Sequence, residues 1–96
     1  MAAYFIDLDG TVFYFGTNTF LPNAADNLRR LAGDGNQVIF TTLRDAQGAD
    51  EARQALESEG LGRCPIITGV ESPRIVINDE GAKAVNHPRN APWPAI

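Results

Sequence analysis

The chain has 96 residues, of which 44% are hydrophobic and 21% are charged, and its formal net charge is −4. These values are typical of one soluble globular domain near the lower end of the size range that builds its own core. The apolar runs are too short to span a bilayer. The N-terminus also lacks the basic start and long apolar stretch that are typical of a secretory signal. We therefore expect a single domain over residues 1–96, no membrane partner and a cytoplasmic location.

Charge and cysteine content exclude further classes of function. Basic residues are scattered through an acidic chain, so the sequence lacks the basic patch that duplex nucleic acid requires. The single cysteine, Cys64, excludes an internal disulfide or a cysteine zinc cluster, and its apolar neighbours indicate core packing. An acidic protein that handles a phosphate anion needs a cation to offset its own field.

The first predicted elements are a strand and a flap. Residues 4–6 are apolar and lead into Asp7, Asp9 and Gly10, which predicts a buried strand that ends in a loop. Residues 12–20 alternate aromatic side chains with Gly16 and small polar residues, which predicts a short β-hairpin flap. Its aromatic side chains are expected mainly to pack the flap onto the core.

The rest of the chain alternates strands and helices. One helix is expected from Pro22-Asn23 to Gly33, and a second runs from an Asp45 N-cap to Gly60. Further strands are expected at residues 38–40, 65–67, 74–77 and 82–85. This order predicts an α/β fold, a single Rossmann-like open and mainly parallel sheet flanked by helices. Residues 68–73 join two of the expected strands. This link is short for a connection between parallel strands, because such a crossover usually needs about a dozen residues or more.

The strongest chemical signal is the acidic pair after the first strand. Asp7 and Asp9 are two residues apart, so on a strand both point to the same side. They lie at the carboxyl end, where open α/β sheets bind ligands. A magnesium ion would relieve their mutual repulsion, and Gly10 allows a close backbone approach to a ligand. The spacing does not match a calcium loop, while a pair of solvated acids before a turn is the alternative interpretation.

Three stretches together resemble a known family. Residues 5–11 read FIDLDGT and look like the first motif of the haloacid dehalogenase-like phosphatases. Residues 38–44 read VIFTTLR and resemble the second motif, an apolar strand that ends in Thr or Ser. Residues 74–79 read RIVIND and resemble the fourth motif, an apolar strand that ends in an acidic pair. The resemblance covers nearly the whole chain and implies a magnesium-dependent phosphomonoester hydrolase.

The resemblance also implies a role for each matching residue. Asp7 would attack phosphorus and form an aspartyl-phosphate, and Asp9 would act as general acid and then general base. Asp7, the backbone carbonyl of Asp9, and Asp79 would hold Mg²⁺. The side chain of Thr42, with the backbone near Leu43 and Gly10, would bind the phosphoryl oxygens.

The chain departs from the family pattern in several places. The lysine of the third motif is missing, so Arg74 or Lys83 is the candidate cation, and Asn78 replaces the first acid of the fourth motif. The helix expected between the last two strands is absent, and there is no room for a cap domain. Capless relatives act on large or exposed phosphorylated substrates or close the site by oligomerising, so a homo-oligomer is an option. The alternative to a phosphatase is a weak or inactive module that binds a metal or a partner. The sequence does not identify the natural substrate.

Overall fold

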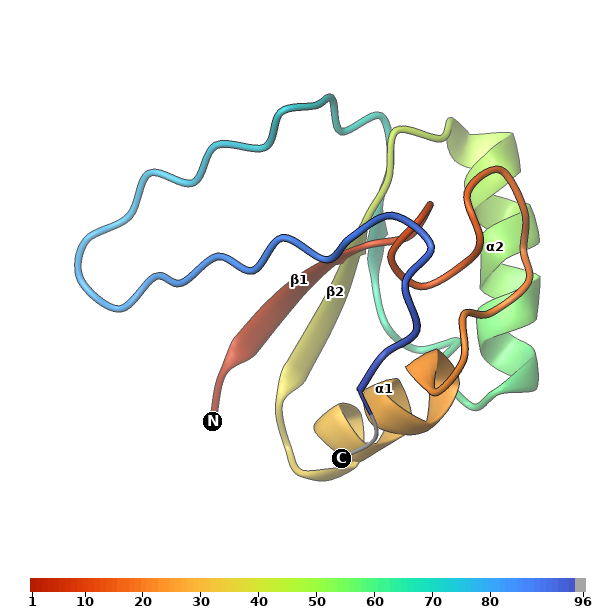
Figure 1. Ribbon diagram of the computed structural model, residues 1–96, viewed down its shortest axis with the longest axis horizontal. Coiled ribbons are helices and arrows are strands. Elements are labelled where there is room, and N and C mark those ends of the chain that lie inside the picture. The colour runs from red at the N-terminus through yellow and green to blue at the C-terminus, as the bar shows by residue number, and fades with distance from the viewer. Residues whose placement is uncertain (95–96) are drawn as a thin grey trace.

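The computed structural model describes residues 1–94, so the last two positions of the expected 1–96 domain lie outside the described residues. Its elements are β1 (Ala3–Asp7), α1 (Ala24–Gly33), β2 (Gln37–Thr41), α2 (Ala46–Ser58) and β3 (Ile66–Ile67). The three strands form one parallel sheet in the order β1-β2-β3 (Figure 1). The predicted α/β class, with an open parallel sheet and two helices, is confirmed.

Both helices begin and end close to the predicted positions. α2 begins after Asp45, whose carboxylate accepts a hydrogen bond from the Gly48 amide at 2.9 Å, as an N-cap should. Its buried residues Ala49, Ala52 and Leu56 follow the spacing of one helix face. In the part of the chain that the structure describes, no helix combines the length and the apolar character needed to cross a membrane.

The helices cover one face of the sheet. The chain moves through β1, β2 and β3 in one direction, and right-handed crossovers then place both connecting helices on the same face. On that face Ile6, Val38 and Phe40 are buried. Phe5 points to the other face, opposite Ile39, and is 67% exposed. The fold therefore has two layers, the sheet and one layer of helices, whereas a full Rossmann-like fold has helices on both faces of its sheet.

The segment between β1 and α1 is a compact loop. The Leu8 carbonyl accepts hydrogen bonds from the amides of residues 11–13, so the chain coils tightly after the strand. The expected hairpin flap is reduced to an isolated antiparallel bridge between Phe13 and Phe20, whose rings pack edge to face at 5.0 Å. Phe13 is fully buried, whereas Phe15 is exposed. The loop thus combines core packing with a rim that faces solvent.

The predicted strands at residues 74–77 and 82–85 are wrong, since neither stretch is a strand in the structure. Residues 73–86, here called the arm, leave the body as an extended loop, drawn from cyan to blue at the left of Figure 1. Among the residues described, the arm backbone makes no hydrogen bond to another backbone group. The short link at residues 68–73 is the physical reason, because it holds no crossover that would return the chain to the open edge of β1.

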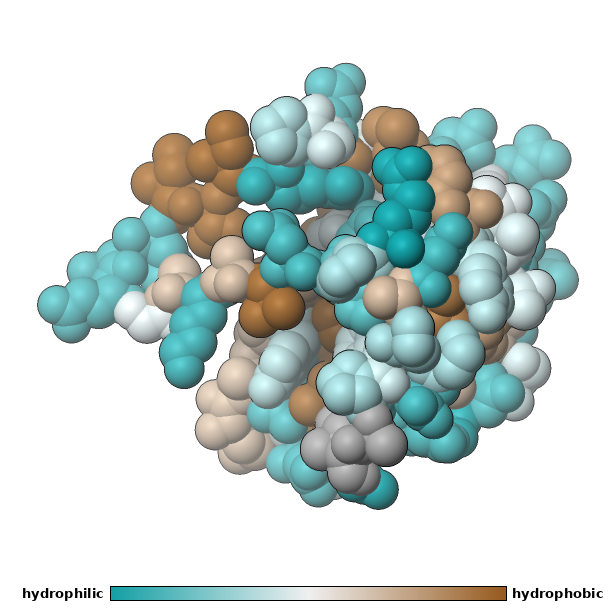
Figure 2. All heavy atoms as spheres, in the orientation of Figure 1, coloured by the Kyte–Doolittle hydropathy of each residue, from teal (hydrophilic) through white to brown (hydrophobic). Residues whose placement is uncertain are grey.

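The arm carries apolar side chains into solvent. Ile77 is 94% exposed, and Ile75, Val76 and Val85 are also exposed. Hydrophobic spheres gather at this side of the molecule in Figure 2. The core instead lies between the helices and the sheet, where the largest fully buried side chains are Phe13, Phe40, Leu8, Leu21, Leu28, Leu56 and Leu61.

Candidate functional site

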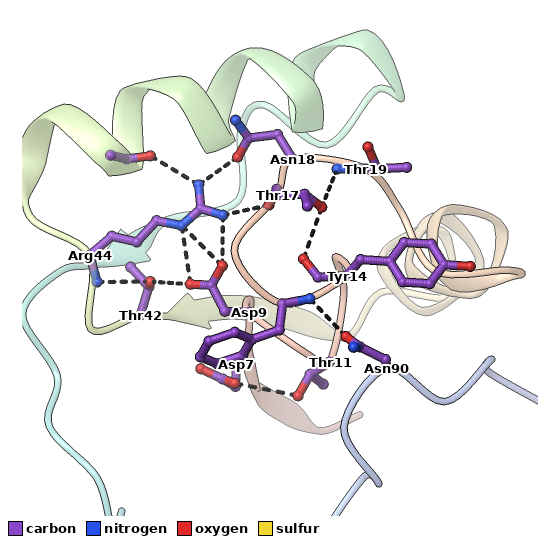
Figure 3. A network of polar contacts seen from close by, with 12 residues as sticks. Asp7, Asp9, Thr11, Tyr14, Thr17, Asn18, Thr19, Thr42, Arg44 and Asn90 are labelled. Carbon is purple, nitrogen blue, oxygen red and sulfur yellow. Dashed lines mark hydrogen bonds and ion pairs between the residues drawn. The ribbon is translucent and has the colours of Figure 1, made fainter.

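Asp7 ends β1 with its carboxylate directed into a polar cluster. Its Oδ2 accepts a hydrogen bond from the Thr11 hydroxyl at 3.4 Å (Figure 3), and its Oδ1 lies 3.3 Å from Nη2 of Arg74. The Asp7 side chain is 34% exposed, so it is partly shielded from water but accessible to a ligand. The strand, the following loop and the base of the arm therefore meet at this carboxylate.

The protonation of Asp7 is shifted by its surroundings. Burial raises the pKa of Asp7 above its ordinary value, and the neighbouring Asp9 carboxylate raises it further. The Arg74 guanidinium and the hydrogen bond from Thr11 lower the pKa, but burial outweighs them. A carboxylate whose negative charge is poorly solvated gains from a nearby cation, which is what an incoming metal or an arginine supplies.

Asp9 is held by Arg44, which follows β2. Nη2 of Arg44 lies 2.7 Å from Oδ1 of Asp9, and its Nε lies 3.3 and 3.1 Å from the two carboxylate oxygens. The remaining guanidinium donors bind the Asn18 side chain and the carbonyls of Thr17 and Gly48 (Figure 3). Arg44 thus connects the acidic loop, the flap and the first turn of α2.

Arg44 is the main site residue that the sequence prediction left without a role. It appears in the second-motif stretch VIFTTLR, but only as part of the pattern. Its position three residues past β2, at the same sheet edge as Asp9, was the available signal. The contact itself depends on the path of the flap, which the pattern of apolar residues does not specify.

Thr42 is fully buried, and its hydroxyl is already engaged. The hydroxyl lies 3.5 Å from Oδ2 of Asp9 and accepts a hydrogen bond from the Arg44 amide at 3.1 Å. Thr42 does not line the cavity above Asp7, whereas Leu43 and Gly10 do. Thr42 therefore contacts the Asp9 carboxylate from the buried side, away from the cavity, and orients this carboxylate.

The two backbone sites predicted for phosphate differ in their availability. The Gly10 amide donates to the Phe13 carbonyl at 2.8 Å, so it is used within the loop. The Leu43 amide donates no hydrogen bond to any residue within 1–94. Of the two, Leu43 offers the free donor at the cavity wall.

The two candidate cations lie in different places. Arg74 reaches Asp7 from the base of the arm, with Nη2 also 3.1 Å from the Val70 carbonyl. Lys83 is exposed on the returning half of the arm. The structure brings Arg74, but not Lys83, to Asp7.

Asp79 is exposed on the arm and does not line the cavity that Asp7 and Asp9 line, so the structure does not bring the three acids together. Among the described residues, the side chain of Asn78 donates only to the carbonyls of Asp79 and Glu80. Within residues 1–94, no three His, Cys, Asp or Glu side chains are grouped to hold a metal ion. The oxygen donors near Asp7 fit Mg²⁺ only in part. They amount to one carboxylate and a neighbouring backbone oxygen, whereas Mg²⁺ usually takes a larger set of oxygen ligands.

A cavity of about 1020 Å³ opens above the acidic pair. Its wall includes both aspartates and the three arginines Arg44, Arg74 and Arg89. Gly10 has φ +81°, and an added Cβ there would lie 3.1 Å from Cγ of Arg89. A side chain at position 10 would therefore be strained and would press on Arg89.

The segment after the arm closes over this loop. The Asn90 amide donates to the Gly10 carbonyl at 2.9 Å, and its side chain accepts from the Phe15 amide at 2.7 Å (Figure 3). The Trp93 indole donates to the Thr11 carbonyl at 2.6 Å, and its ring packs against the core. His87 also lines the cavity. These contacts join an irregular segment to residues far away in the chain, so no periodic pattern in the sequence predicts them.

Comparisons of the chain with protein-family models, with curated proteins and with solved structures find no match. The resemblance to haloacid dehalogenase-like phosphatases therefore stays a prediction that rests on the motif residues. Chemically, the site combines an accessible carboxylate, a second carboxylate fixed by an arginine, and cations around an open cavity. That combination suits a phosphorylated ligand, since arginine donors match phosphate oxygens.

Proposed function

We propose that the chain is a magnesium-dependent phosphomonoester hydrolase that works through an aspartyl-phosphate on Asp7. The observation that carries the proposal is the pairing of the Asp7 carboxylate with Arg74 at the mouth of a cavity, with Asp9 two residues away. The family resemblance of residues 5–11 supports the same assignment. The substrate is a phosphate monoester.

In the first half of the reaction, an Asp7 carboxylate oxygen attacks phosphorus and the bond from phosphorus to the leaving oxygen breaks. Asp9 must enter this step protonated, and it donates that proton to the leaving oxygen, so the leaving group departs as an alcohol. In the second half, Asp9 takes a proton from water, and the water oxygen attacks phosphorus and releases Asp7. Arg44 fixes the direction of Asp9 in both halves.

The neighbouring groups stabilise the charge that develops on the phosphoryl oxygens. Arg74 takes the place of the missing motif lysine, and the Leu43 amide donates to one oxygen. Thr42 acts through Asp9, and Gly10 gives the loop its turn. The loop at residues 12–20 serves as the flap of a pared-down capless fold.

Mg²⁺ is the proposed cofactor, and Asp7 and the backbone carbonyl of Asp9 would hold it. When bound, the ion offsets the negative charge of the carboxylate and of the phosphoryl group. Asp79 would join it only if the arm folded toward β1. An incomplete oxygen set predicts weak affinity for the ion.

A second candidate function is a module that binds a metal or a partner without turnover. The exposed position of Asp79 on the arm favours it, because the acid that would complete the metal site does not line the cavity with Asp7. The two functions differ in one species: the phosphatase forms a covalent phosphoenzyme, and the binding module does not.

The test is to trap that product. Protein mixed with acetyl phosphate and Mg²⁺, quenched in acid and digested, should carry phosphate on the peptide that contains Asp7, and hydroxylamine should remove it. The Asp7→Asn protein should carry none. Absence of a labelled Asp7 peptide in wild-type protein that binds Mg²⁺ would favour the binding module.

A further inference from the structure

Arg89 is the cavity arginine whose charge is not matched by an acid. Arg44 pairs with Asp9 and Arg74 with Asp7, whereas Arg89 forms no ion pair with any residue in 1–94. Its guanidinium carbon instead lies 4.2 Å from the centroid of the Phe15 ring. An acidic protein therefore places one uncompensated cation at the wall of the cavity that holds its acidic pair.

The Arg89 side chain is positioned by its surroundings. Its stem passes over the face of Gly10, where an added Cβ would lie 3.1 Å from Cγ of Arg89 and 3.5 Å from Cδ2 of Phe15. The next residue, Asn90, is hydrogen-bonded to both Gly10 and Phe15. Its φ is 62°, a conformation that non-glycine residues seldom adopt. The loop that carries the acidic pair and the segment that carries Arg89 thus hold each other in register.

Within residues 1–94 the Arg89 guanidinium donates no hydrogen bond, so its N–H groups are available to a ligand beside the Phe15 ring. A cation over an aromatic face keeps its N–H groups in the plane of the fork, where they bind a phosphate or carboxylate in bidentate geometry. The donors near Asp7 serve the phosphoryl group under attack, and Arg89 sits on the side of the cavity formed by Phe15 and Gly10.

We propose that Arg89 binds a second anionic group of the substrate, so that the preferred substrates are small phosphate esters that carry a further carboxylate or phosphate. The proposal rests on the proposed phosphatase function for its catalytic consequence, but the binding preference stands apart from turnover. Arg89 is a specificity-determining residue in this scheme and takes no part in the chemical step.

The experiment compares matched ligands that differ by one anionic group. Glycerol 3-phosphate supplies a single anion, 3-phosphoglycerate adds a carboxylate, and 2,3-bisphosphoglycerate adds both a carboxylate and a second phosphate. Affinity is measured by calorimetry with wild-type, Arg89→Ala and Arg89→Lys proteins. Arg63→Ala is the control, because it removes the same charge from an exposed residue that does not line the cavity.

Wild-type protein should bind 3-phosphoglycerate more tightly than glycerol 3-phosphate by about tenfold, the effect expected of one charge-assisted hydrogen-bonded contact. Arg89→Ala should remove that preference while leaving glycerol 3-phosphate affinity within about twofold, and Arg89→Lys should restore part of it. A further gain for the bisphosphate that Arg89→Ala also removes would show that Arg89 accepts a phosphate group. Equal affinity for the ligands with one and with two anionic groups, or a preference that survives Arg89→Ala, would overturn the proposal.

Hydrolysis of the same ligands separates this proposal from the proposed function. An Arg89-dependent preference in binding without phosphate release would keep the anion site and reject the phosphatase. Phosphate release from all ligands at similar kcat/KM, in wild-type and Arg89→Ala proteins alike, would keep the phosphatase and reject the anion site.

Discussion

The guanidinium of Arg44 binds both carboxylate oxygens of Asp9, with the shortest contact 2.7 Å between Nη2 and Oδ1. The two side chains are only 15% and 20% exposed, so the pair is shielded from solvent and from salt. The same arginine binds the flap and α2, and the position of the proposed acid–base residue therefore depends on it.

Replacing Arg44 by alanine should lower both stability and activity. The change leaves a shielded carboxylate without its main partner, and we expect about 2 kcal/mol of destabilisation in urea unfolding. Turnover should fall at least about tenfold, because Asp9 is no longer directed at the leaving oxygen. Arg29→Ala is the matched control. Arg29 pairs with Asp26 and Glu59 at the surface, so its loss should change stability by less than about 1 kcal/mol. Equal effects of the two variants would contradict the assignment.

Asp7→Asn should stabilise the fold at neutral pH. The pKa of Asp7 is raised in the folded protein, chiefly by burial, so the folded state binds more protons than the unfolded state as the carboxyl titrates. Stability contributed by this residue is therefore lost as pH rises from the unfolded pKa, near 3.8, through the higher folded pKa. An amide carries no charge to desolvate, so the melting temperature of the variant should exceed that of wild type at pH 7. The difference should vanish at pH 3, where both side chains are neutral. A variant less stable than wild type at pH 7 would show that the Arg74 contact outweighs burial.

Arg74→Ala should move the acid limb of the pH–rate profile to higher pH. Arg74 lowers the pKa of Asp7, and without it the nucleophile stays protonated to higher pH. At neutral pH the loss of turnover should be at least about tenfold, or about 1.4 kcal/mol of barrier. Lys83→Ala removes an exposed charge from the arm and should leave the profile in place. A shifted profile in Lys83→Ala and an unchanged one in Arg74→Ala would transfer the role to Lys83.

The arm should be the first part of the chain that a protease cuts. Its backbone makes no ladder hydrogen bonds within the described residues, and an extended exposed segment fits a protease cleft. Trypsin at low ratio should cleave after Lys83 before it cleaves after Arg29, Arg30 or Arg53 in the helices. Lys83→Gln should slow the first cut without changing the later ones. Early cleavage within α1 or α2 would contradict an exposed arm on a stable body.

The strands and helices that carry their own local signals were predictable. Asp45 marks the start of α2, and the apolar runs before Asp7 and Thr42 mark β1 and β2. Residues 74–77 have an equally strong apolar, β-branched pattern but form no strand. Strand propensity requires a neighbour to pair with, and the short link at residues 68–73 does not lead the chain back to β1.

The site was predictable to a similar degree. The spacing of Asp7 and Asp9, together with the sheet edge that they share with Arg44, follows from the sequence. The placing of Asp79 depended on a strand that does not form. The contacts of Arg89, Asn90 and Trp93 come from an irregular segment, and no periodicity in the sequence predicts where such a segment lies.

The most direct test of the proposed chemistry is phosphate release from para-nitrophenyl phosphate by wild-type protein with Mg²⁺, by the same protein with EDTA, and by Asp7→Asn protein. We expect turnover only in the first sample, because the reaction needs both the cation and the Asp7 carboxylate. Phosphate release that persists in Asp7→Asn protein would contradict the nucleophile assignment, and none in metal-replete wild-type protein would contradict the phosphatase itself.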